Sequence, residues 1–308
     1  MAPMATRTLG TAGSTLPFLP ALGFVLVWSS GYIAGPYGVT AMKPLALVGW
    51  RFVLATVIVT VLARVLRGPL RVDRRTALRI AVVGFVMNGL QFGAMYLAFA
   101  AGLGATLGAL LHSLSPVLTA VIAGVAMGER LTRVQVLGFV VGVAGVLLVL
   151  GPDVDEAGGA VGLGFAVVGV LSLSLGTIGQ RWIGHGPDPL WSAAIQFAVS
   201  GPPLLLLAGL VEGGDPVMDW SRALGVLAYL AVVNSIVGLV LLGVLVRRGG
   251  ASAGSSVFFL SPPVTAVMAW LVLGETLTLR EGAGLLVAVL GVAAATRGGS
   301  AAPEEPAT

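Results

Sequence analysis

The chain has 308 residues, of which 57% are hydrophobic and only 10% charged, and its net charge is +4 at pH 7. Soluble domains carry about 25% charged residues, so this chain lacks the side chains that a water-facing exterior needs. The absence of cysteine excludes a disulfide framework and a thiolate metal site. With a mean hydropathy of +1.00, the sequence predicts an all-α integral membrane protein.

Apolar runs follow one another along nearly the whole chain. They are continuous and close to the length of about 20 residues that a helix needs to cross a bilayer, whereas barrel strands would alternate polar and apolar residues. We predict ten transmembrane helices near Pro17–Tyr37, Pro44–Leu66, Ala77–Phe99, Ala105–Met127, Val134–Leu150, Ala160–Ile178, Leu190–Leu210, Ala223–Val246, Ala251–Leu273 and Gly282–Thr296.

The basic residues indicate how the chain is oriented. If the N-terminus is cytoplasmic and the spans alternate, the outside receives only Lys43, Arg222 and Arg280, and Arg51 lies within a span. The other basic residues fall on the cytoplasmic side, which is the bias expected of an inner-membrane protein with both termini in the cytoplasm. This placement accounts for the basic composition, so no nucleic-acid partner is expected. The inside set is Arg7, Arg64, Arg67, Arg71, Arg74, Arg75, Arg79, Arg130, Arg133, Arg181, Arg247, Arg248 and Arg297.

The two halves of the chain resemble each other. Leu114-Ser115-Pro116 recurs as Leu260-Ser261-Pro262, and the same shift of 146 residues (from 114 to 260) brings Asn88 to Asn234. A shift of 145 brings Pro44-Leu45 to Pro189-Leu190. Because five spans is an odd number, the second half must be inverted relative to the first. Inverted repeats are a common build of secondary transporters, in which the substrate site lies near the membrane midplane.

The repeat divides the chain into four parts. We predict a cytoplasmic N-terminal segment (1–15), a first five-helix repeat (16–151), a second five-helix repeat (158–297) and a disordered cytoplasmic tail (298–308).

These features together resemble the EamA-type exporters of the drug/metabolite transporter superfamily. The resemblance covers about Pro17 to Arg297, and the motifs that carry it are Trp28-Ser29-Ser30-Gly31, Pro44-Leu45 with Arg51-Phe52, the two Ser-Pro pairs, and the Gly-Glu-x-Leu-Thr endings of spans four and nine. It implies a ten-helix export carrier whose central cavity is lined mainly by spans one, three, four, six, eight and nine.

Two ionisable side chains within spans are candidates for recognition, because polar groups in the hydrocarbon usually face a cavity or a partner. His112 could bind substrate or carry a proton, with Ser115 and Thr119 on a similar helical face, or it could be a neutral histidine bonded to a carbonyl. Arg51 could bind a substrate carboxylate or could play a structural role, either snorkelling or bridging the halves. No Asp or Glu lies deep in any span, so proton coupling through a buried carboxylate is not expected.

The remaining candidates are neutral polar or aromatic side chains predicted to face the cavity, each with packing as the alternative. Asn88 and Asn234 could equally be hydrogen-bonding partners between helices. The other predicted substrate-binding residues are Trp28, Ser29, Ser30, Tyr32, Gln91, Tyr96, Ser115, Ser172, Ser174, Thr177 and Ser261.

Other motifs receive structural predictions. Pro116 and Pro262 each remove a helical hydrogen bond, so kinks are expected there. Glu129 and Glu275 end spans four and nine as solvated caps, arginine partners or gating groups. The small-residue stripe Gly138, Gly142 and Gly145 predicts close packing, within the chain or in a homodimer.

The function predicted from these observations is export of small polar or amphipathic metabolites, amino acids being the first class, by alternating access. The alternatives are an importer or passive facilitator, or a sensor or lipid-handling protein on the same scaffold. Gly250-Ala251-Ser252-Ala253-Gly254 matches a nucleophile-elbow pattern, and a serine protease using Ser252 and His112 is a remote alternative because no strand precedes the motif. We expect no enzyme activity, cofactor or metal; the expected partners are a small-molecule substrate and membrane lipid.

Overall fold

The computed structural model describes residues 18–127, 131–152, 154–184, 186–245 and 258–297. Within these ranges nine helices are long and apolar enough to cross a membrane, and residues 258–273 form a shorter apolar helix where the ninth span is predicted. The start of that span, residues 251–257, lies outside the described residues. The described part of the chain is helical, and its pairing of β type is limited to the isolated bridge between Met42 and Val217.

The first repeat supplies spans one to five. Its elements are α1 (Phe18–Val39), α2 (Pro44–Arg67), α3 (Arg74–Gly84) continuing through η1 (Phe85–Leu90) into α4 (Gln91–Ala100), α5 (Ala105–Ser113) and α6 (Ser115–Met127) as one broken span, and α7 (Arg133–Leu150). The short 3-10 helix η2 (Asp155–Ala157) leads into the second repeat.

The second repeat supplies spans six to ten. Its elements are α8 (Gly159–Ile183), α9 (Pro189–Val211), α10 (Trp220–Tyr229) with η3 (Leu230–Val237), η4 (Phe258–Leu260) with α12 (Ser261–Leu273), and α13 (Leu279–Arg297). The span that starts with α10 continues as helix to Leu245.

Spans three and eight each begin three residues before the predicted position. The reason is an acidic N-cap: Asp73 accepts a hydrogen bond from the Thr76 N–H, and Asp219 accepts one from the Arg222 N–H. A capping side chain satisfies amide groups that have no partner in the first helical turn, so the helix includes polar residues that precede the apolar run. These bonds also lower the pKa of Asp73 and of Asp219 below its usual value.

The described helices are irregular at both Ser-Pro pairs, where kinks were predicted. The helix of span four is interrupted at Leu114, between α5 and α6, and span nine changes from η4 to α12 at Leu260 and Ser261. Proline lacks an amide hydrogen and its ring clashes with the preceding turn, which is why both breaks precede Pro116 and Pro262. The π-helices η1 and η3 in spans three and eight were not predicted.

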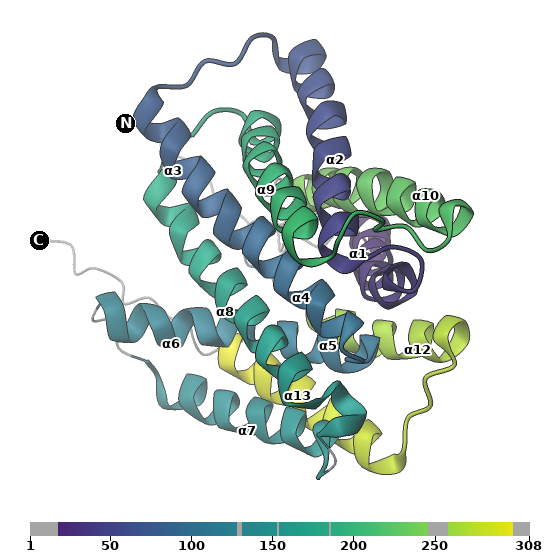
Figure 1. The fold of residues 1–308 in the computed structure, drawn as a ribbon. Coiled ribbons are helices and arrows are strands. Elements are labelled where there is room, and N and C mark those ends of the chain that lie inside the picture. The colour runs from purple at the N-terminus through teal and green to yellow at the C-terminus, as the bar shows by residue number, and fades with distance from the viewer. Residues whose placement is uncertain (1–17, 128–130, 153, 185, 246–257, 298–308) are drawn as a thin grey trace, which may run out of the picture.

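Two helix pairs form the outer walls of the molecule. α2 packs along α9 on one side and α7 packs along α13 on the other, with the remaining helices between them (Figure 1). The glycine stripe of α7 faces α13, and a Cβ at Gly145 would lie only 2.3 Å from the backbone nitrogen of Ala288. The stripe therefore serves close helix packing within the chain and is covered, so it does not form a dimer surface.

Candidate functional site

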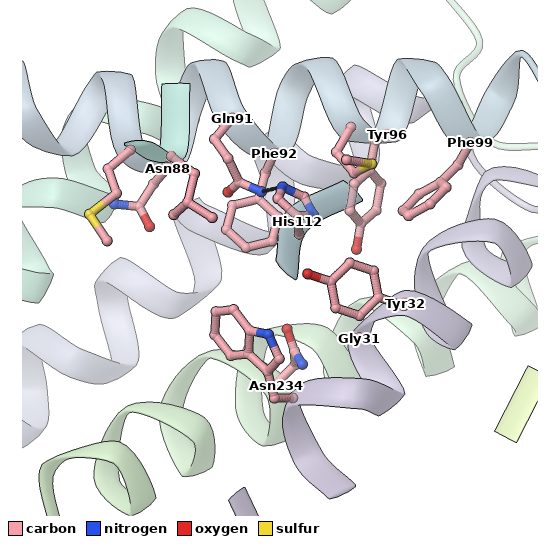
Figure 2. Close-up of a pocket in the computed structure, with 13 residues that line it drawn as sticks. Gly31, Tyr32, Asn88, Gln91, Phe92, Tyr96, Phe99, His112 and Asn234 are labelled. Atoms are coloured by element: carbon pink, nitrogen blue, oxygen red, sulfur yellow. Dashed lines mark hydrogen bonds between the residues drawn. The ribbon is translucent and has the colours of Figure 1, made fainter. Parts of the chain in front are cut away.

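A central pocket of about 80 Å³ lies between the two repeats. Figure 2 shows Gln91, Phe92 and Tyr96 directed into it from α4, with Tyr32 of α1 and Asn234 of η3 on the opposite wall. Spans one, three, four, six and eight supply the lining, as the family resemblance implies, whereas no described residue of span nine takes part. The lining is Trp28, Gly31, Tyr32, Met87, Asn88, Gln91, Phe92, Met95, Tyr96, Phe99, His112, Leu173 and Asn234.

His112 lies in the wall of this pocket with one ring nitrogen unpaired. Its Nε2 is 2.9 Å from Nε2 of Gln91, the contact drawn in Figure 2, and its ring centroid is 5.6 Å from that of Tyr32. The Nδ1 atom is buried and has no hydrogen-bond partner among the described residues. Buried polar atoms are normally paired, so an unpaired one beside a pocket is suited to a bound solute or water.

A second cavity of about 430 Å³, which we call the vestibule, lies between the pocket and one end of the molecule. The two share the lining residues Trp28, Met87, Asn88, Phe92 and Asn234, so they are adjacent cavities. The vestibule is lined there by Ile183, Gly184, Gly186, Pro187 and Pro189, at the connection between α8 and α9. Arg67 ends α2, Arg74 begins α3 and Arg181 lies in the last turn of α8 at this end, which we call the basic end. We call the opposite end of the spans the far end.

The cavity is closed toward the far end by Phe99. Its ring lies between α1 and α5, where a Cβ at Gly35 would be 2.6 Å and a Cβ at Gly108 2.9 Å from ring atoms. Only residues without a side chain leave room for the ring at these two positions. Leu103, at 2% exposure, packs beside Gly108 and completes the closure.

Two carboxylates hold helix N-termini at the far end. Glu275, after α12, accepts hydrogen bonds from the N–H groups of Ala105 and Thr106 at 2.7 and 3.2 Å and from the Thr106 hydroxyl at 2.8 Å. Glu275 is therefore a helix cap, which is one of the roles predicted from the sequence, but the helix that it caps is α5 of the other repeat. Glu212 binds the N–H groups of Leu45 and Ala46 in the same way, at 2.7 and 3.0 Å. Glu129 and Ser252, for which gating and catalytic roles were considered, lie outside the described residues.

Arg51 is 3% exposed and lines the vestibule, although it is charged. It donates from Nη2 to Oδ1 of Asn234 at 2.7 Å, from Nε to Oγ of Ser235 at 3.1 Å and from Nη1 to the Tyr96 hydroxyl at 3.4 Å. Its guanidinium carbon lies 4.5 Å from the centroid of the Phe92 ring. No carboxylate of the described residues contacts it.

The repeat-related position carries the corresponding link with a neutral side chain. Gln196 of α9 stands where Arg51 stands in α2, and its Oε1 accepts a hydrogen bond of 3.1 Å from Nδ2 of Asn88. Asn88 and Asn234 lie in the π-helices η1 and η3, and π-helical turns are frequent at functional sites. Both asparagines line the central pocket, and both accept or donate a hydrogen bond between helices. The two roles considered from the sequence, cavity lining and interhelical hydrogen bonding, are therefore compatible.

Four of the predicted binding serines are instead paired between helices. The hydroxyl of Ser29 in α1 lies 3.2 Å from that of Ser261 in α12, and that of Ser174 in α8 lies 3.1 Å from that of Ser115 in α6. None of them lines the central pocket or the vestibule. The two pairs are related by the repeat, and the sequence could not show this because it does not reveal which helices are neighbours.

Three further candidates also lie away from the cavity. Ser30 lines a separate groove of about 610 Å³ between α1, α10 and α12, where it accepts a hydrogen bond from the Tyr229 hydroxyl at 2.6 Å. Ser172 is buried and donates to the carbonyl of Val168 in its own helix. Thr177 is exposed on the outside of α8 and bonds back to Leu173. Spacing along a helix did not distinguish the inner face from the lipid face.

Several lining residues were missed from the sequence. Met87, Phe92 and Phe99 are apolar, so their side chains give no sign that they face a cavity. The only indication was that they lie three or four residues from Gln91 or Tyr96, and therefore on the same face of the helix. Glu212 was not singled out, because an acidic residue at the end of a span looks like an ordinary solvated terminus.

The profile of the EamA-like transporter family matches residues 16–151 and 160–297 of the chain. An uncharacterized transporter of Bacillus subtilis, YvbV, is 28% identical over 167 residues, or 54% of each chain. A probable amino-acid metabolite efflux pump of Salmonella typhimurium is 30% identical over 178 residues, which is 53% of this chain and 58% of that protein. A WAT1-related chloroplastic protein of Arabidopsis thaliana is 26% identical over 176 residues, 54% of this chain and 42% of that protein. The matched region thus spans about half the length of these relatives.

The fold also resembles a crystal structure that covers 91% of this chain and 96% of its own, with a TM-score of 0.63. The two sequences are 19% identical, so this likeness concerns the fold alone.

Proposed function

Because the chain belongs to the EamA-like transporter family, whose profile matches both of its halves, we propose that it is a secondary exporter of small metabolites. Amino acids and similar amphipathic solutes are the first class to consider, since one relative is named a probable amino-acid metabolite efflux pump. The protein is a multi-pass membrane protein of a transporter family; the direction, the substrate and the membrane are parts of the proposal.

The observation that carries the proposal is the cavity between the repeats. The vestibule extends from the basic end toward the adjacent central pocket with His112 and Gln91, and Phe99 closes this pocket toward the far end. A carrier that works by alternating access needs a central site open to one side at a time. The geometry supports this cycle, with residues 16–151 and 158–297 as the two units that rearrange.

The arginine distribution supports a cytoplasmic basic end. Lysine and arginine accumulate in cytoplasmic loops of membrane proteins, and the vestibule opens beside Arg67 and Arg181. In this orientation, both termini are cytoplasmic, the membrane is the inner membrane, and the structure represents the state that receives solute from the cytoplasm. Opening at the far end would then release the solute outside.

The test is counterflow in proteoliposomes. Vesicles containing the purified protein are loaded with pools of unlabelled metabolites and offered a labelled trace of a member of the pool. Saturable uptake that is absent from protein-free vesicles supports a carrier, and comparison of inward with outward gradients in oriented vesicles addresses the direction.

The other functions predict different outcomes. A passive facilitator gives flux without acceleration by solute on the opposite side, and a lipid-handling protein gives scrambling of labelled lipid without counterflow. A sensor binds solute and moves none. Absence of counterflow for every pool, with protein that remains folded, would refute the proposed carrier.

A further inference from the structure

Arg51 carries a positive charge that no described residue neutralises. Among the described residues it is the one charged side chain that is buried, and its three hydrogen-bond partners are a serine, a tyrosine and an asparagine. It lies about 10 Å from the start of α2 at Pro44, taking 1.5 Å per residue. Charged groups inside a membrane are costly and generally serve a function or have an opposite charge beside them.

Its guanidinium also retains donor capacity. The group has five N–H donors, and the structure uses one on each of Nε, Nη1 and Nη2. Both Nη atoms therefore keep one N–H each without an acceptor among the described residues. The rings of Phe92 and Phe52, 4.5 and 5.5 Å from the guanidinium carbon, contact the cation but accept no conventional hydrogen bond.

The other repeat shows that the structural link does not require a charge. Gln196 connects α9 to the π-helix of span three through Asn88, as Arg51 connects α2 to the π-helix of span eight through Asn234. A neutral amide is sufficient for this connection in the second case. Snorkelling does not explain the charge either, because Arg51 is bound to groups inside the molecule and is 3% exposed.

Arg51 lines the vestibule of about 430 Å³, whose described lining is otherwise neutral. Arg51 is the one charged side chain among the described residues that line the central pocket and the vestibule, and none of these residues is acidic. A single positive charge matches a monoanion, and the planar guanidinium matches a carboxylate. Trp28 and Phe92 line the same vestibule as Arg51 and provide aromatic surface for the rest of the solute.

We propose that Arg51 binds the carboxylate of the transported solute, so that the protein selects small monocarboxylates with an apolar or aromatic body. The inference rests on the proposed transport function and specifies the substrate class for the same cavity. Solutes that lack a carboxylate leave the positive charge of Arg51 without a counter-charge and are rejected. Cations without an anionic group are rejected as well, because no described residue of the cavity offers them a carboxylate.

The test compares acids with their amides. Purified protein is titrated with L-phenylalanine and L-leucine, with the carboxamides of both, with 3-phenylpropionate, and with phenylphosphonate as a second anion. Binding is measured by the rise in melting temperature and by competition for a labelled acid. The wild type is expected to bind the acids about 10- to 100-fold more tightly than the amides, the range for one hydrogen-bonded charge pair.

Three variants separate charge from structure. Arg51→Gln installs the side chain that serves in the other repeat; it is expected to fold and to lose the preference for acids. Arg51→Lys is expected to keep part of the preference, since it retains the charge. Gln196→Ala removes the twin link without removing the charge, and is expected to keep the preference even if overall affinity changes.

The outcomes distinguish the two proposals. Equal binding of acids and amides to the wild type, or an unchanged preference in Arg51→Gln, overturns the role of Arg51. Preference for phenylphosphonate over every carboxylate overturns the substrate class. Counterflow of amides or cations at the rate of acids leaves the carrier intact but overturns this inference. Acid-selective binding lost in Arg51→Gln, without counterflow of any solute, supports the anion site and refutes the transporter.

Discussion

Replacement of Glu275 by glutamine should loosen the closure at the far end. The carboxylate accepts three hydrogen bonds from Ala105 and Thr106. Glutamine has only one accepting oxygen, so its NH₂ group would face one of these N–H groups and that hydrogen bond would be lost. Hydrogen bonds to charged groups contribute about 1.5–3 kcal/mol each when buried. Glu275 is half-buried, and water replaces part of what is lost, so we expect a net change of about 1–2 kcal/mol.

This free energy changes the population of the closed far end. Because the bonds connect α12 of one repeat to α5 of the other, they are lost when the repeats separate there, so the variant destabilises the closed state selectively. Each 1.4 kcal/mol is about tenfold in an equilibrium constant, which predicts a rise of about 5- to 30-fold in the ratio of open to closed far ends.

Cysteine labelling measures that ratio directly, because the chain contains no native cysteine. Leu103→Cys places a thiol beneath the contact, at a position that is 2% exposed. In purified protein, the rate of maleimide labelling at this site should rise by the same factor when Glu275→Gln is added.

Glu281 provides the matched control. Its carboxylate lies near the same end and accepts bonds of 2.7 and 2.8 Å from the N–H and hydroxyl of Thr278, three residues before it in the sequence. Glu281→Gln removes a local cap without affecting contact between the repeats, so labelling of Leu103→Cys should be unchanged. Equal labelling rates in the two variants, or no increase in Glu275→Gln, would refute the reasoning.

The remaining predictions concern packing and recognition. Gly145→Val should lower the unfolding free energy by about 1–3 kcal/mol, because its side chain meets the α13 backbone, whereas Gly164→Ala, with nothing within 4 Å, should leave the melting temperature unchanged or higher. His112→Phe, which copies the repeat-related Phe258, should keep the fold but raise the half-saturation concentration in counterflow several-fold; an unchanged value would remove His112 from recognition. Ser174→Ala should cost about 0.6 kcal/mol, the average for such bonds between membrane helices, and leave substrate affinity unchanged; altered affinity with normal stability would contradict its structural assignment.

The sequence was sufficient for the architecture because strong, additive signals determine it. Long apolar runs require membrane helices, in which backbone groups bond within each segment, and the matching shift from Asn88 to Asn234 exposes the repeat. The breaks before Pro116 and Pro262 follow from the lost amide hydrogen. The predicted starts of spans three and eight were less accurate, because a polar N-cap such as Asp73 lets the helix begin before the apolar run.

The site was predicted in part. Trp28, Tyr32, Gln91, Tyr96 and His112, with both asparagines, do line the central pocket. Serine was the least informative residue type, because a hydroxyl in a membrane helix satisfies itself equally well with a neighbouring helix or with its own backbone.

What the sequence alone determined is that this chain is a helical membrane protein of two inverted repeats with few polar groups in its spans. Only the tertiary structure decided which of those groups face a cavity, because the lipid face and the inner face of a membrane helix can both be apolar, and neighbours far apart in the chain select between them. It also showed that Arg51 and Gln196 make equivalent links with different charge. That difference becomes visible only when the partners, Asn234 and Asn88, are in place.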